Sequence, residues 1–216
     1  MRVVRGPARG MRWVSDSTVH GFWLGYWELE TQRRFAARLH SGDVVYDIGA
    51  HVGLYTLLSS SRVGPEGHVY AFEPSPKNVG YLKRHIQLNG LRNCTVVEAA
   101  VSDRTGSGRF DPTEHTSAGR LSDSGEMTVR TLSLDEFVFA SPGRLPPTAI
   151  KIDAEGAELE VLRGGSRTLA EYSPFIFLST HSAELDRRCC EFLAAAGYSI
   201  VHLASDMVWA EIPGSR

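Results

Sequence analysis

The chain has 216 residues and a formal net charge of −2, with 42% hydrophobic and 22% charged residues. This length suits one domain with a substantial core, and the composition is ordinary for a soluble globular protein. The near-neutral charge gives no support to a nucleic-acid partner, and no apolar run approaches the ~20 residues that span a bilayer. Three cysteines without metal-ligand spacing favour a reduced, cytoplasmic setting over a disulfide framework.

The sequence predicts that helices and strands alternate along most of the chain. Apolar residues recur at helical spacing between Val19 and Leu39, so residues 1–40 are expected to form an N-terminal segment with a helix that packs on the main domain, residues 41–216. Within that domain the patterns predict strands at 44–48, 68–72, 95–98, 149–153 and 175–178, helices at 53–61, 75–88, 155–169 and 183–196, and a closing hairpin of 198–203 with 207–210. This order predicts an α/β fold with a mostly parallel sheet, helices on both faces and an antiparallel edge from the hairpin.

The segment 104–138 interrupts this alternation. Residues 104–124 are polar and rich in Gly, Ser and Thr, so a long loop is expected there, with His115 as an exposed side chain. A strand and the short helix 134–137 are expected to follow.

A glycine turn follows the first strand, in the pattern Asp47-x-Gly49-Ala50-x-x-Gly53. Glycines at such a turn let the backbone approach a ligand at the carboxyl end of the sheet. A dinucleotide site would require a glycine where His51 stands, and His51 is expected to point away as part of the turn. The pattern instead resembles motif I of S-adenosylmethionine (SAM) dependent methyltransferases, with Asp47 facing the ammonium group of SAM. An NAD-linked oxidoreductase is the alternative.

Further positions along the chain point to a nucleoside. Glu73 ends the second strand, where an acid can accept hydrogen bonds from both ribose hydroxyls. Ala100 and Ser102 follow the third strand and are expected beside the adenine, where backbone amides can read its edge. NAD and SAM share these groups, so the choice of SAM rests on the glycine spacing.

Polar side chains end the fourth and fifth strands. The fourth strand is expected to lie next to the first, so Asp153 at its end faces the methyl group, and a buried acid there indicates a function or an ion pair. His181 lies at the same edge and is placed to accept a proton, with a histidine that only caps the loop as the alternative. Glu155 and Glu158 are further candidate ligands or bases, although a helix start favours acids anyway. Catechol-type methyltransferases hold a metal with an Asp-Asn pair after the fifth strand; Ser179-Thr180-His181 stands here, so no metal is predicted.

Together these motifs resemble the FkbM family of SAM-dependent methyltransferases. The likeness is carried by Gly25-Tyr26-Trp27-Glu28, the turn from Asp47 to Gly53, Ala71-Phe72-Glu73-Pro74 and the stretch from Lys151 to Glu158. The resemblance implies a seven-stranded Rossmann-like sheet with the last strand antiparallel, and methylation mostly of oxygen in secondary metabolites or sugars. The expected acceptor is therefore a hydroxylated small molecule. A SAM-binding regulatory domain without turnover is a further alternative.

The chain departs from that family at one position. Family members often carry an acid two residues before the histidine that follows the fifth strand, and Ser179 stands there instead. An acid–histidine pair at this place therefore does not carry over. No pattern indicates an oligomeric state.

Overall fold

The computed structural model describes residues 1–112, 119–122, 124–140, 142–204 and 206–214. Its central layer is a seven-stranded sheet in the order β10-β11-β9-β8-β1-β2-β3. The strands are β1 (Val44–Ile48), β2 (His68–Phe72), β3 (Cys94–Val97), β8 (Ala149–Ile152), β9 (Phe175–Ser179), β10 (Ser199–Ala204) and β11 (Met207–Glu211). Because β3, β2, β1, β8 and β9 all pair in parallel, the predicted α/β class is confirmed.

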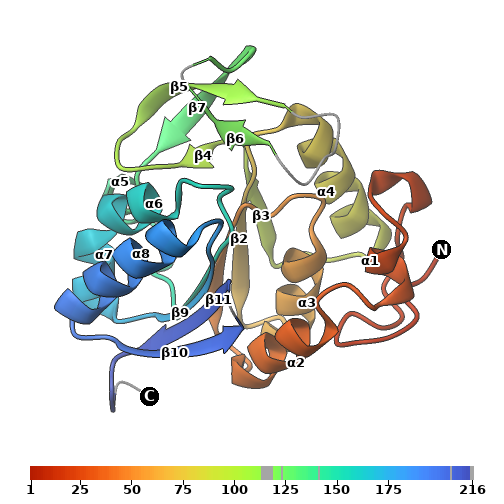
Figure 1. Ribbon diagram of the computed structural model, residues 1–216. Coiled ribbons are helices and arrows are strands. Elements are labelled where there is room, and N and C mark those ends of the chain that lie inside the picture. The colour runs from red at the N-terminus through yellow and green to blue at the C-terminus, as the bar shows by residue number, and fades with distance from the viewer. Residues whose placement is uncertain (113–118, 123, 141, 205, 215–216) are drawn as a thin grey trace.

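Helices cover both faces of this sheet (Figure 1). Those of the main domain are α3 (Leu54–Val63), α4 (Pro76–Leu88), α5 (Leu134–Phe139), α6 (Glu158–Gly164), α7 (Ser166–Tyr172) and α8 (Ala183–Ala195). Successive side chains of β1 point to opposite layers: Tyr46 packs in one apolar cluster with Leu193 of α8, and Val45 packs in another with Leu58 of α3. A strand that is apolar on both faces requires both helical layers. Among the described residues, no helix is long and apolar enough to cross a membrane.

Local signals explain where two of these helices begin. Ser75 and Ser182 accept hydrogen bonds from the amides of the first turns of α4 and α8, as expected for N-cap residues. The predicted helix 155–169 is wrong at its start, because Glu155 has a φ of 49° and a left-handed residue cannot open an α-helix. The helix begins at Glu158 instead and is divided from α7 at Gly165.

The closing hairpin lies at one edge of the sheet, as predicted, and the last strand of the chain is antiparallel, as the family resemblance implies. β11 lies between β10 and β9 and runs antiparallel to both, so the antiparallel strand is internal and β10 forms the edge. Burial explains the order, since Met207, Val208 and Ala210 of β11 are buried whereas Val201 of β10 is exposed. The more apolar strand of the hairpin takes the covered position.

A second sheet replaces the long loop that was expected over residues 104–124. It contains β4 (Ala100–Val101), β7 (Met127–Leu132), β5 (Gly106–Asp111) and β6 (Arg120–Leu121), in that order. Phe110 is buried and packs with Ala100 and Val129 in a small apolar cluster. This cluster stabilises the second sheet, although the sequence of the segment is mostly polar. The interpretation of His115 as an exposed side chain falls outside the described residues.

The N-terminal segment contains η1 (Ser15–Ser17), α1 (Gly21–Leu24) and α2 (Leu29–Arg38) in place of the single predicted helix. The helix breaks at Gly25, whose φ of 77° is left-handed and where a β-carbon would lie 2.4 Å from the carbonyl oxygen of Arg5. Trp13 is buried and stacks on His85 of α4, with ring centroids 4.0 Å apart. Trp13 also shares one apolar cluster with Leu57 of α3, so the N-terminal segment packs against the main domain. The division of the chain into two parts at residue 40 stays a proposal.

Candidate active site

A cavity of about 1070 Å³, including its open mouth, lies at the carboxyl ends of β1, β2 and β8. This is the edge at which open α/β sheets bind ligands. Phe22 and Trp27 of the N-terminal segment close part of it, and Phe110 and Leu121 of the second sheet close another part. The lining of the cavity therefore comes from the N-terminal segment, the seven-stranded sheet and the second sheet.

The predicted glycine turn forms the floor of this cavity. Gly49 lines it with a φ of 71°, and a β-carbon there would lie 1.8 Å from the carbonyl oxygen of Asp153. Ala50 also lines the cavity. Gly53 does not: its φ is 101°, and a β-carbon would lie 2.6 Å from Leu82 of α4. Gly49 thus permits the close crossing of the β1 and β8 loops, whereas Gly53 permits the packing of α3 against α4.

Glu73 is fixed in orientation at the second strand end. Its side chain lines the cavity although the residue is only 5% exposed. Oε2 accepts from the amide of His51 at 2.8 Å, and Oε1 accepts from the amide of Ser75 at 2.9 Å and from Nδ2 of Asn78 at 3.2 Å. A carboxylate can accept about four hydrogen bonds, so capacity remains for a ligand. Burial raises the pKa of the Glu73 carboxyl.

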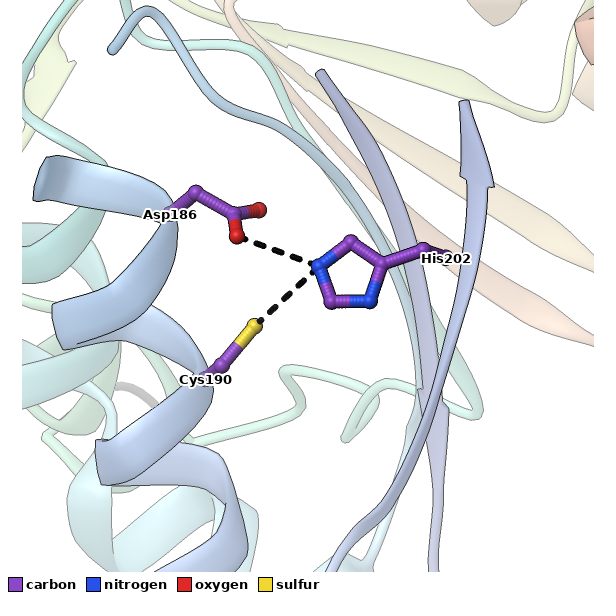
Figure 2. A group of neighbouring side chains, drawn as sticks. All are labelled: Asp186, Cys190 and His202. Atoms are coloured by element: carbon purple, nitrogen blue, oxygen red, sulfur yellow. Dashed lines mark hydrogen bonds and ion pairs between the residues drawn. The ribbon is translucent and has the colours of Figure 1, made fainter. Parts of the chain in front are cut away.

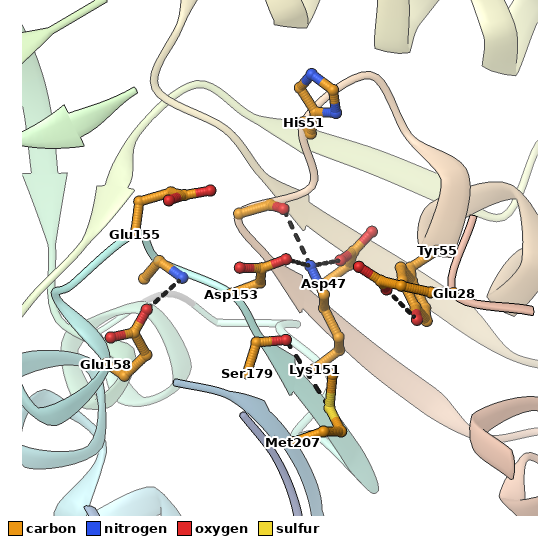
Figure 3. Close-up of polar contacts among 12 residues, drawn as sticks. Glu28, Asp47, His51, Tyr55, Lys151, Asp153, Glu155, Glu158, Ser179 and Met207 are labelled. Atoms are coloured by element: carbon orange, nitrogen blue, oxygen red, sulfur yellow. Dashed lines mark hydrogen bonds and ion pairs between the residues drawn. The ribbon is translucent and has the colours of Figure 1, made fainter. Parts of the chain in front are cut away.

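Lys151 stands at the centre of the polar network (Figure 3). Its Nζ donates to the carbonyl oxygen of Gly49 at 3.2 Å and to Oδ2 of Asp153 at 3.3 Å. Oδ1 of Asp47 lies 3.8 Å away. Burial disfavours the charged amine, but the carboxylates of Asp153 and Asp47 outweigh it and raise the pKa of Lys151. A buried ammonium therefore faces the cavity.

Asp47 lies behind this lysine. The residue is fully buried, is not part of the cavity lining, and accepts a hydrogen bond from Oγ1 of Thr56 at 2.6 Å. Its Oδ1 is buried without a hydrogen-bond partner. The sequence predicts that Asp47 faces the ammonium of SAM directly or through water. In the structure Lys151 lines the cavity and Asp47 does not, so Asp47 acts on the cavity through the lysine.

Residues that the sequence analysis did not assign complete this wall. The hydroxyl of Tyr55 donates to Oε2 of Glu28 at 2.9 Å, and both residues line the cavity. Burial raises the pKa of the Glu28 carboxyl. The signal that could have found Glu28 is the stretch Gly25 to Glu28, which carries the family likeness but gives no indication of its distance from the glycine turn.

A second polar cluster surrounds His181. Its Nε2 lies 3.5 Å from Oδ1 of Asp153 and 3.2 Å from Oε2 of Glu155. Its Nδ1 lies 2.9 Å from Oε1 of Glu158, a fully buried residue. The hydrogen bond to Glu158, opposed by burial and supported by the other carboxylates, raises the pKa of His181 to about 9. The structure thus brings Asp153 and His181 together, but with the histidine protonated at neutral pH.

His181 stands at the rim rather than in the cavity, whose lining includes Asp153 and Glu155 but not the histidine. The ligand atoms of these three residues lie within 4.8 Å of one another, so they could also hold a divalent cation. Ser179, two residues before His181, turns its hydroxyl toward the sulfur of Met207 at 3.8 Å. It takes no part in the cluster.

At the other end of the cavity the lining is apolar, with Ala99, Ala100, Val101 and Phe110. This surface suits the flat face of a purine. Ser102 lies outside the lining, and its amide donates to the carbonyl oxygen of Leu132 at 2.9 Å, so of the two residues expected beside the adenine the structure brings only Ala100 to the cavity.

His51 belongs to the cavity lining, and its ring points away from the polar network around Lys151 (Figure 3). Its backbone is left-handed, with a φ of 52°, and its amide donates to Glu73 within the turn. Burial lowers the pKa of its imidazole to about 4. The ring is therefore neutral.

The charge balance of the site favours a cationic ligand. Carboxylates outnumber cations, because Lys151, His181 and Arg120 are the cations of the site and six acids surround them: Glu28, Asp47, Glu73, Asp153, Glu155 and Glu158. Buried carboxylate oxygens of Asp47 and Glu158 also lack hydrogen-bond partners. Since SAM carries a sulfonium cation, an amino-acid end, a ribose and a purine, the acids, the buried lysine, Glu73 and the apolar end fit this cofactor.

Comparison with known proteins decides the family. Residues 47–200 match the Methyltransferase FkbM domain. The chain belongs to the FkbM methyltransferase family. It is 27% identical over 175 residues to the hexuronic acid methyltransferase AglP of Haloferax volcanii, covering 80% of this chain and 70% of AglP. It is 31% identical over 146 residues to the 31-O-demethyl-FK506 methyltransferase FkbM of Streptomyces tacrolimicus, covering 62% of this chain and 55% of that protein.

The fold of this FkbM-family chain is also that of a solved FkbM structure. The crystal structure of Methyltransferase FkbM from Methylobacillus flagellatus superposes with a TM-score of 0.62 at 18% identity, covering 93% of this chain and 56% of the other. The chain therefore spans little more than half the length of several proteins it matches. Family and fold identify a SAM-dependent methyltransferase and do not favour the NAD-linked oxidoreductase.

Replacement of Glu73 by alanine is expected to weaken SAM binding roughly 10- to 150-fold, since a hydrogen bond to a charged group contributes about 1.5–3 kcal/mol. Titration calorimetry measures the affinity, and thermal unfolding checks that the variant folds. Glu98→Ala is a matched control, because Glu98 is an exposed acid paired with Lys83 outside the cavity. Equal SAM affinity in Glu73→Ala and the wild type would remove Glu73 from the ribose site.

Proposed function

We propose that this methyltransferase methylates a hydroxyl oxygen of a small molecule, in the class of sugars and secondary metabolites. The observation that carries the proposal is the cluster of Asp153, Glu155 and His181 at the rim of the cavity. These side chains can accept a proton, and they lie at the carboxyl ends of the strands. The names of the relatives support it, since AglP is a hexuronic acid methyltransferase and FkbM acts on 31-O-demethyl-FK506.

In this proposal, residues of the cavity lining hold SAM. Glu73 binds the ribose hydroxyls, Ala100 lies beside the adenine, and the backbone at Gly49 and Ala50 allows close approach. Lys151 and the acids around it orient the amino-acid end of the cofactor. SAM supplies an electrophilic methyl group on a positively charged sulfur. The protein contributes alignment of the acceptor and exclusion of water.

An alcohol is a poor nucleophile until its proton leaves, so the acceptor needs a base. We propose that Asp153 holds the acceptor hydroxyl in line and that His181 receives its proton at Nε2. With a pKa of about 9, only a small fraction of His181 is neutral at pH 7, and that fraction grows as the pH rises. A cationic ligand in the cavity disfavours the imidazolium and shifts the histidine toward its neutral, proton-accepting form.

The function is tested by binding and by product. Calorimetric titration with SAM, S-adenosylhomocysteine and NAD should show binding of the first two, and mass spectrometry should show the gain of one methyl group in a panel of hydroxylated sugars and metabolites. Tight binding of NAD alone would sink the proposal. Binding of SAM without methylation of any acceptor would favour the regulatory alternative.

Methyl transfer is expected to continue in EDTA, since Lys151 and His181 already offset part of the charge on Asp153. The measurement is the initial rate with saturating SAM before and after chelation, followed by addition of Mg²⁺. Loss of activity that Mg²⁺ restores would make Asp153, Glu155 and His181 ligands of a catalytic cation, because their ligand atoms lie close enough to share one.

We further propose a cytoplasmic location and no nucleic-acid partner. All three cysteines, Cys94, Cys189 and Cys190, are free, which suits a reducing compartment. The net charge of −2 gives no field that would attract a polyanion.

A further inference from the structure

Asp186, Cys190 and His202 form a side-chain cluster away from the methyl-transfer cavity (Figure 2). Asp186 and Cys190 are four residues apart on α8 and therefore share one face of the helix. His202 comes from β10, the edge strand of the sheet. None of the three residues lines the cavity.

Both contacts of His202 converge on the same ring nitrogen. Nε2 lies 3.1 Å from Oδ2 of Asp186 and 3.9 Å from Sγ of Cys190. A Cys-His-Asp catalytic relay would use the two different nitrogens of the ring, one for the thiol and the other for the carboxylate. Convergence on one nitrogen is instead the arrangement of ligands around a shared point.

The spacing fits a tetrahedral metal. With zinc–ligand bonds of about 2.0–2.3 Å, neighbouring ligand atoms lie roughly 3.3–3.6 Å apart. The observed separations of 3.1 and 3.9 Å lie on either side of that range, and all three ligand atoms are within 4.8 Å of one another. Small rotations of these three side chains, of which His202 is exposed and the other two are half-buried, would therefore complete the geometry.

The surroundings orient the ligands and leave room for water. Thr180, which is 5% exposed, donates from Oγ1 to Oδ1 of Asp186 at 3.3 Å and so leaves Oδ2 directed at His202. Such outer hydrogen bonds fix metal-ligating carboxylates. The His202 side chain is 51% exposed, so solvent can reach a fourth coordination position. A thiolate, an imidazole and a carboxylate together favour Zn²⁺ over Mg²⁺ or Ca²⁺.

We propose that Asp186, Cys190 and His202 bind Zn²⁺, with water as the fourth ligand, and that the ion joins α8 to the edge strand β10. Binding releases the thiol proton of Cys190 to solvent, because the thiolate is the ligand. The ion would hold β10 at the open edge of the sheet, where Val201 is exposed. The role is structural and independent of methyl transfer.

The test uses the whole protein, stripped with chelator and dialysed, and titrated with Zn²⁺ and with Co²⁺. One equivalent of metal should bind, Co²⁺ should give a thiolate-to-metal charge-transfer band, and Zn²⁺ should raise the melting temperature. Cys190→Ser and His202→Gln should each lose the band and weaken Zn²⁺ binding more than ~10-fold, and Thr180→Val should weaken it ~10- to 100-fold. Cys94→Ser is the control and should bind as the wild type does.

Methyl transfer by Cys190→Ser should match the wild type, so the zinc site and the proposed function are tested separately. A wild-type protein that gives no cobalt thiolate band would overturn the zinc proposal, as would Cys190→Ser with unchanged affinity. Binding that is lost in His181→Gln but kept in His202→Gln would overturn it as well, and would assign the metal to the active site.

Discussion

Replacement of His181 by glutamine is expected to slow methyl transfer roughly 10²- to 10⁴-fold while SAM still binds, the range typical of a lost general base. The glutamine amide can still donate to Glu158, so the buried carboxylate keeps a partner. Rates at saturating SAM and calorimetric SAM affinity separate catalysis from binding. His68→Gln is the matched control, because His68 bonds Thr95 outside the cavity.

The pH profile tests the same assignment. If His181 is the base, kcat/KM of the wild type, which reports the free enzyme, should rise with pH toward the pKa of about 9, and His181→Gln should lose that dependence. A wild-type rate that is already level below pH 7 would transfer the role to a carboxylate, Asp153 or Glu155. The slope of the profile therefore distinguishes the two kinds of base.

Stability should respond in the opposite direction. The folded pKa of His181 lies above the ~6.5 of an unfolded histidine, so the protonated ring stabilises the fold fully below that value, and the contribution is lost as the pH rises through about 9. Because the side chain is 33% exposed, solvent screening reduces the expected effect to about 1 kcal/mol. Urea unfolding of the wild type and His181→Gln at both ends of this window measures it.

Gly49→Ala is expected to lower the free energy of unfolding by about 3 kcal/mol or more, or to prevent folding. The added β-carbon would lie 1.8 Å from the carbonyl oxygen of Asp153, on a residue with a φ of 71°. Neither backbone can move without separating β1 from β8. Urea unfolding provides the measurement.

A second glycine gives the control for this change. Gly80 lies within α4 and has open space where a β-carbon would be built, so Gly80→Ala should stabilise the protein by about 0.5–1 kcal/mol. Equal stability of Gly49→Ala and the wild type would show that the crossing of the two loops tolerates a side chain.

The strands and turns around the cofactor were predictable because their signals are local. β-branched and aromatic runs end at Ile48 and Phe72, and the residues that follow are Gly49 of the turn and Glu73, the acid that we propose for the ribose. The order of strands in a parallel sheet then places Asp153 next to Gly49. Residues that directly follow a strand could therefore be placed at the cavity from the sequence, whereas their roles toward the cofactor stay predictions.

The rest of the site depends on contacts between distant segments. Whether an acid faces a ligand or a neighbouring lysine is decided by side chains from other strands and helices, as Thr56 and Lys151 decide it for Asp47. Glu28 reaches the cavity through Tyr55, a partner that helical periodicity does not reveal. The pKa of His181 likewise follows from a buried Glu158, whose position at a helix start indicates only a favourable dipole.

The position of β11 has a consequence for biosynthesis. This strand follows β10 along the chain but separates it from β9, so β10 cannot join the sheet until β11 has been made. Synthesis proceeds at about 5–20 residues per second, whereas a hairpin forms in about 1–10 μs. On the ribosome, the strands that surround the cofactor are complete while the outer edge of β9 still lacks a partner. The hairpin then docks as one unit, and the nascent chain carries an open, aggregation-prone strand edge until that moment.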